Sequence, residues 1–146
     1  MRRWSCRAPG FTLVELLAAV LVLAILMAVA LPLYLSAVAS SARRTARGNM
    51  HTLVNAEQVF RLKYGYYTRT PQNLVNSNVI DKLPVGPGDT RYTLHPGEDP
   101  DNPEGADSAL PDGRTVPPGG VAVCGSDARL GAAGDYGCFI PGQDTE

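Results

Sequence analysis

The chain has 146 residues and a formal net charge of −1; 45% of its residues are hydrophobic, but only 7% are aromatic. This length allows one small domain, alone or with an appendage, and the near-zero charge gives no general reason to expect a nucleic-acid partner. Three cysteines, two histidines and the lack of a C-x-x-C pair in the sequence leave little material for a zinc site.

Charge, glycine and proline divide the chain into three segments. Residues 1–10 carry three arginines and no acidic residue, and residues 11–65 carry five basic residues against two acidic ones. Residues 66–146 carry five basic residues against twelve acidic ones, a net charge of −7, and hold 22 of the 27 glycines and prolines. We therefore expect a basic N-terminal segment, a stalk at 11–65 and an acidic, turn-rich head at 66–146.

The stretch from Phe11 to Leu35 is a continuous apolar run. Its 25 residues would span about 37 Å as a helix, and a bilayer core needs roughly 20 apolar residues. It has no polar stripe, which argues against an amphipathic helix of a soluble domain. A removed signal peptide is the alternative, but its apolar region is usually only about 7–15 residues long. We therefore predict a transmembrane helix at 11–35.

Two residues of this run are unusual in a membrane span. Glu15 could reach the interface near the positive end of the helix dipole, or it could need a cation from another chain. Its position alone does not decide between these interpretations. Pro32 removes one helix hydrogen bond and predicts a kink.

The start of the apolar run resembles the processing and methylation motif of type IV prepilins, and it reads Gly10-Phe11-Thr12-Leu13-Val14-Glu15-Leu16-Leu17. A short basic segment ends in glycine, phenylalanine follows, a glutamate stands five residues after the glycine, and a long apolar helix continues. Pro32 also falls where these proteins commonly have a proline. The resemblance is to type IV pilins and type II secretion pseudopilins.

The resemblance implies a processing pathway and a set of partners. A prepilin peptidase would remove residues 1–10 as a leader by cutting between Gly10 and Phe11, and Phe11 would be N-methylated. Glu15 would neutralise the N-terminus of a neighbouring subunit, which selects the second interpretation of this residue. Further implied partners are other copies or related pilins, an inner-membrane assembly platform, and membrane lipid before assembly.

The second half of the stalk keeps a helical pattern up to Gly65, a helix-stop signal. Residues at intervals of three and four form one apolar stripe that Glu57 interrupts; they are Ala46, Met50, Leu53, Glu57, Phe60 and Tyr64. We expect this stripe to be buried under the head. For Arg43, Arg44 and Arg47 we favour a solvated or lipid-headgroup collar over DNA binding.

The sequence of the head predicts short strands at Arg91–His95, Gly120–Cys124 and Tyr136–Ile140. A connecting loop that includes Thr68–Asn73 is expected before them. So few apolar residues cannot build a large independent core, so the stalk helix must supply one wall. The expected fold is α+β and pilin-like, with a long N-terminal membrane-spanning helix packed against a small antiparallel sheet.

Cys124 and Cys138 are the cysteines that would remain after cleavage at Gly10. A disulfide between them would close a loop of about 15 residues and stabilise the head by ~3 kcal/mol. Such a bond implies an oxidising compartment, which places the N-terminus in the cytoplasm and the head outside. Two free buried thiols are the alternative.

An acidic stretch at Pro96–Pro111 is the only candidate metal site that we consider. Its weak calcium candidates are Glu98, Asp99, Asp101 and Asp107. Prolines interrupt the cluster and EF-hand spacing is missing, so we favour a solvated loop and predict no cofactor. His51 and His95 look isolated, and no catalytic set emerges.

These features predict a structural subunit of a type IV pilus-type filament rather than an enzyme. It would first be a single-pass protein of the inner membrane and then part of an extracytoplasmic filament. The alternatives are a type II secretion pseudopilin, or a minor pilin with an adhesive or DNA-uptake role. The net charge of −7 on the head disfavours nucleic-acid binding there.

Overall fold

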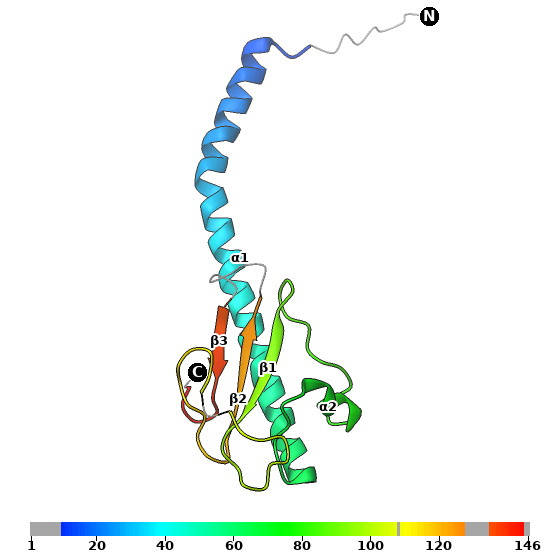
Figure 1. Ribbon diagram of the computed structural model, residues 1–146. Coiled ribbons are helices and arrows are strands. Elements are labelled where there is room, and N and C mark those ends of the chain that lie inside the picture. Colours follow the sequence, from blue (N-terminus) through cyan, green and yellow to red (C-terminus); the bar gives the residue numbers. More distant parts are fainter. Residues whose placement is uncertain (1–9, 108, 128–134, 145–146) are drawn as a thin grey trace, which may run out of the picture. The chain divides into compact units, whose positions relative to one another are not determined.

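The computed structural model describes residues 10–107, 109–127 and 135–144, so most of the predicted leader lies outside the described residues. In chain order its elements are α1 (Leu13–Tyr64), α2 (Pro71–Asn76), β1 (Arg91–Pro96), β2 (Val121–Ser126) and β3 (Asp135–Phe139) (Figure 1). The chain divides into two compact units, residues 1–39 and 40–146. The predicted α+β layout, one long apolar N-terminal helix and a small antiparallel sheet, is confirmed.

The first unit contains the N-terminal part of α1. Every large apolar side chain from Leu13 to Val38 is exposed, by 49% or more. The helix is continuous through Pro32, and the kink expected there stays a prediction. Among the described residues, α1 is the one helix long and apolar enough to cross a membrane.

The second unit contains the sheet, whose strands follow the order β1-β2-β3 and are all antiparallel (Figure 1). Leu94 of β1 pairs with Val123 of β2, and Cys124 of β2 pairs with Cys138 of β3. All three predicted strands are present, with ends shifted by one or two residues.

The core lies between the sheet and the part of α1 that belongs to this unit. Its members come from α1, α2 and all three strands; they are Met50, Leu53, Val54, Ala56, Phe60, Leu74, Leu94, Val123 and Phe139. The predicted stripe is therefore buried as far as Phe60. Tyr64, which we expected to continue it, is 46% exposed, because α1 ends there.

A second, smaller cluster covers the other face of the sheet, and it comprises Leu110, Val116, Ala122, Cys124 and Ile140. Successive residues of a strand point to opposite faces. Val123 therefore joins the core beneath α1, while Ala122 and Cys124 join the second cluster. This explains why β2 is buried from Val121 to Gly125 without alternation.

Helix α2 corrects the prediction of a loop at Thr68–Asn73. Pro71 stands at the helix start, where its fixed φ is favourable and its missing N–H costs nothing. The helix is retained because Leu74 is fully buried in the core. The stop predicted at Gly65 is confirmed: this residue has a φ of +90°, which glycine adopts without strain.

Candidate functional site

The first turn of α1 is held by a reciprocal cap. The backbone N–H and the hydroxyl of Thr12 both donate to Glu15 Oε2, each at 3.0 Å, and Glu15 N–H donates to Thr12 Oγ1 at 3.3 Å. This is a capping box, in which a threonine and a glutamate three residues later satisfy each other's backbone N–H groups. The Thr-x-x-Glu spacing at 12–15 is the signal in the sequence that predicts this cap.

The cap shows what Glu15 does within a single chain. Its carboxylate faces outward and forms no ion pair with any residue that the structure describes. Gly10 and Phe11 precede the helix and are exposed, with the Phe11 side chain 86% accessible. Among the described residues, no atom beyond its chain neighbours lies within 4 Å of the position that a Cβ on Gly10 would occupy. The peptide bond between Gly10 and Phe11, where we predict cleavage, therefore lies in an exposed segment before the helix.

Glu57 is the buried acid of the head. Its side chain is fully buried, its Oε2 accepts the N–H of Thr68 at 3.0 Å, and its Oε1 has no partner. Burial raises the pKa of Glu57 to about 8, which the Thr68 N–H opposes, and the neighbouring Glu104 raises it further. Glu57 is thus protonated at neutral pH, so the residue that interrupts the apolar stripe lies in the core as a neutral acid.

Part of the acidic stretch at 96–111 anchors the segment that follows α1. Glu104 accepts hydrogen bonds from the Thr68 hydroxyl at 3.0 and 3.1 Å, and from Asn73 at 3.2 Å. Its Oε2 also accepts the N–H of Arg69 at 2.6 Å. Glu104 is thus a half-buried acceptor of several hydrogen bonds. Its place in an acidic run did not indicate this role.

Two of the four calcium candidates face cations instead. Asp99 lies 3.9 Å from Arg61, and Asp107 contacts both Arg69 and His95. Over the described residues, no three His, Cys, Asp or Glu side chains gather as a metal-binding group. Calcium binding through Glu98, Asp99, Asp101 or Asp107, which we ranked below a solvated loop, stays untested.

His95 is not isolated, in contrast to our expectation. Its Nε2 lies 2.9 Å from Thr93 Oγ1, and its Nδ1 lies 3.1 Å from Asp107 Oδ2. The ring thus ties the loop after β1 back to the strand. His51 packs against Phe139, with ring centroids 3.9 Å apart. Asp107 lies 12 residues after His95 and Phe139 lies far from His51 in the chain, so the sequence pattern did not indicate these two contacts.

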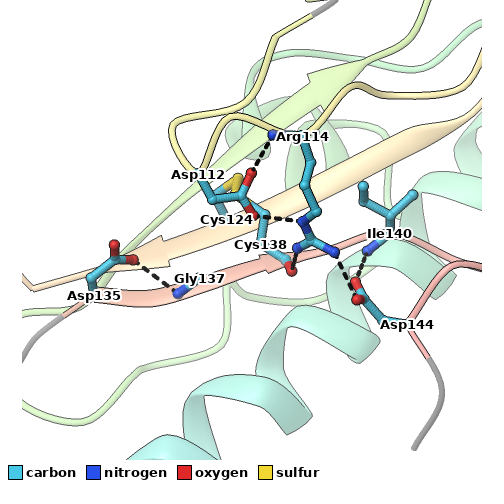
Figure 2. Close-up of polar contacts among 8 residues, drawn as sticks. All are labelled: Asp112, Arg114, Cys124, Asp135, Gly137, Cys138, Ile140 and Asp144. Carbon is cyan, nitrogen blue, oxygen red and sulfur yellow. Dashed lines mark hydrogen bonds and ion pairs between the residues drawn. A yellow bond between two sulfur atoms is a disulfide. The ribbon is translucent and has the colours of Figure 1, made fainter.

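The predicted disulfide joins Cys124 to Cys138, whose Cα atoms are 3.9 Å apart on adjacent strands. Figure 2 shows Arg114 beside it. The Arg114 guanidinium donates to Asp112 at 2.8 Å, to Asp144 at 2.7 Å and to the carbonyl of Cys138. Asp144 in turn accepts the N–H of Ile140 at 2.8 Å. The disulfide and Arg114 together hold the C-terminal strand and turn in place.

Comparison with known proteins gives one match. Residues 7–31 match the prokaryotic N-terminal methylation motif, which is the signature of type IV pilins and pseudopilins. No curated protein and no solved structure matches the chain. The motif supports a type IV pilin-like or pseudopilin subunit, a structural class of protein. With the apolar helix, it indicates membrane anchoring followed by assembly into a surface filament.

Proposed function

We propose that this chain is a structural subunit of a type IV pilus-type filament, cleaved after Gly10, N-methylated at Phe11 and assembled through its apolar helix. The observation that carries the proposal is that the matched motif leads into a helix whose apolar surface is exposed. Within the matched residues 7–31, the large apolar side chains from Phe11 to Leu31 are all more than half exposed in the isolated chain. Lipid would cover them before assembly, and helices of other subunits would cover them afterwards.

Glu15 would give this assembly its register. Lipid tails are as apolar as leucine, so moving the helix from a bilayer to a filament core gains little hydrophobic free energy. A charge pair between Glu15 and the Phe11 amine of a neighbour would be strong in such a low-dielectric core. Thr12 would hold the Glu15 carboxylate at the start of the helix until that partner arrives.

The proposed location follows from the disulfide. A bond between Cys124 and Cys138 is stable in an oxidising compartment, which favours a head outside the cytoplasm and an N-terminus inside. The chain would then be a single-pass protein of the inner membrane before assembly. Its partners would be the prepilin peptidase, an inner-membrane assembly platform and other pilins. We propose that the chain itself holds no cofactor; the methyl group on Phe11 would come from a donor bound by the processing enzyme.

Two related functions are the alternatives. A type II secretion pseudopilin would use the same N-terminal motif, but the disulfide-linked C-terminal strands favour a pilin. A minor pilin with an adhesive or DNA-uptake role is the other. The net charge of −7 on residues 66–146 weighs against DNA binding by the head.

The test is Glu15→Ala in cells that assemble the filament. We expect the mass of the variant to show leader removal and methylation as in the unaltered chain, while sheared filaments are lost. Asp81→Ala is the matched control, because Asp81 is an exposed acid of the head outside the motif. Normal filaments from Glu15→Ala, or a leader retained in the unaltered chain, would contradict the proposal.

A further inference from the structure

A basic pocket lies in the second unit, between α1 and the first residues of β3. It has a volume of about 460 Å³ and is lined by Arg43, Arg44, Arg47, Asp135, Tyr136 and Gly137. Residues three and four apart are neighbours on a helix surface, so the three arginines share one face of α1. A volume of this size is within the range of pockets that hold small-molecule groups.

The three arginines are available for a ligand. All are exposed, and none forms an ion pair with a residue in the described parts of the chain. By contrast, Arg61, Arg69 and Arg114 do contact carboxylates. Planar guanidinium groups bind phosphate oxygens in pairs and are the preferred side chains for phosphate recognition.

Asp135 gives the pocket a second chemical character. It is exposed at the start of β3, and its Oδ1 accepts the N–H of Gly137 at 2.9 Å. A carboxylate beside three arginines weakens the attraction of the pocket for a purely anionic ligand, and it would likewise weaken the attraction for an acidic surface of a second subunit. It favours a ligand that carries both a phosphate and a positively charged amine.

The position of the pocket in the chain indicates the source of such a ligand. Arg43 follows Leu35, the end of the predicted span, by only eight residues, so the chain can separate them by at most about 28 Å. Basic residues just outside a span are attracted to the negative charge of phospholipid headgroups. This step rests on the proposed function, because it takes the apolar part of α1 to lie in a membrane.

We propose that this pocket binds the headgroup of a zwitterionic phospholipid, with Arg43, Arg44 and Arg47 on the phosphodiester and Asp135 beside the headgroup amine. The lipid would hold the head at the membrane surface before assembly. Because extraction from the bilayer requires release of this headgroup, the pocket would also oppose premature departure of the subunit.

The experiment is native mass spectrometry of the purified full chain in detergent, with added phosphatidylethanolamine, phosphatidylglycerol or diacylglycerol. We expect the chain to retain phosphatidylethanolamine most strongly and phosphatidylglycerol less. Diacylglycerol should be retained least, because it has no phosphate. The double variant Arg43→Gln/Arg47→Gln should retain at least about tenfold less phosphatidylethanolamine, since a hydrogen bond to a charged group contributes a factor of about ten or more.

Two variants make the test specific. Lys82→Gln/Arg91→Gln removes the same charge from exposed residues outside this pocket and should retain lipid normally. Asp135→Asn keeps the acceptor for Gly137 and should abolish the preference for phosphatidylethanolamine over phosphatidylglycerol. The expected pattern in a chain that forms no filaments would support the pocket while contradicting the proposed function.

Three results would overturn the proposal. The first is equal lipid retention by the unaltered chain and Arg43→Gln/Arg47→Gln. The second is full displacement of lipid by inorganic phosphate at the same concentration, which would indicate a site for free phosphate. The third is a loss of contacts between subunits in that variant with unchanged lipid retention, which would make the pocket a protein interface.

Discussion

Leu21 and Leu53 lie on the same helix, yet Leu21 is 63% exposed and Leu53 is fully buried. Around Leu21 the helix is apolar on all sides and has no covering layer within its unit. Around Leu53 one stripe is apolar and packs on a three-stranded sheet, while the residues next to it on the other faces, such as Thr52 and Asn55, are polar and exposed. The difference shows that one continuous helix carries two kinds of surface: one that is exposed in the isolated chain, and one that is buried against the chain's own sheet.

The largest expected effect on stability comes from truncating a leucine to alanine, and it should differ between the two regions. Leu53→Ala should lower the free energy of unfolding of the head by about 2–5 kcal/mol, because it leaves a cavity in a closed core. Leu21→Ala should change it by less than about 0.5 kcal/mol, because Leu21 touches no part of that core. Urea unfolding of the full chain in detergent, followed by tyrosine near-UV circular dichroism, measures both. Equal losses would contradict the division into two surfaces.

Removal of the disulfide should affect the head alone. Reduction, or Cys124→Ser/Cys138→Ser, should cost about 3 kcal/mol of unfolding free energy, since the bond closes a loop of about 15 residues. Helix content in detergent should stay unchanged, because the cysteines lie on β2 and β3. Alkylation and mass analysis without reductant provide the control, and two labelled cysteines in the untreated chain would contradict the pairing.

The pH dependence of the head should come from Glu57. Its pKa is about 8 in the folded chain against an ordinary value of 4.5, so the folded state keeps a proton that the unfolded state releases. Stability should therefore fall as pH rises from about 4.5 to about 8 and then level off. Glu57→Gln should remove this fall and be more stable by a few kcal/mol at pH 8 and above. Unfolding curves at pH 5, 7 and 9 test this. If the free energy of unfolding of the variant falls with pH as steeply as that of the unaltered chain, Glu57 is not the source of the pH dependence. Glu98→Gln, at an exposed acid, is the control.

The smallest effect is expected in the apolar region, at the cap. Thr12→Ala should weaken the first turn of α1 by about 1 kcal/mol, because it removes the hydroxyl from the capping box. Faster amide exchange at residues 13–16 is the measurement, and Thr12→Ser should restore protection. Unfolding of the head should not change, and a shift there would show that the two regions are coupled more closely than the contacts indicate.

Much of the secondary structure could be predicted from short-range sequence patterns. The apolar run, the Gly10–Glu15 motif, the stop at Gly65 and the three strands all depend on residues within a few positions of one another. The capping box of Thr12 and Glu15 was equally readable from its spacing. The missed α2 had a local signal as well, the proline after Thr70, but its retention depends on the burial of Leu74.

The sequence by itself determined where the apolar helix begins, where it stops, which stretches form strands and which two cysteines can pair. Only the tertiary structure decided that Glu57 is buried beside Thr68, that Glu104 anchors the segment after α1, and that Arg114 binds Asp144. These partners are between 11 and 36 residues apart. Spacing encodes helix faces and strand faces, whereas contacts over such separations depend on how the chain folds back. For that reason an acidic run that looks like a solvated loop can contain a structural hydrogen-bond hub.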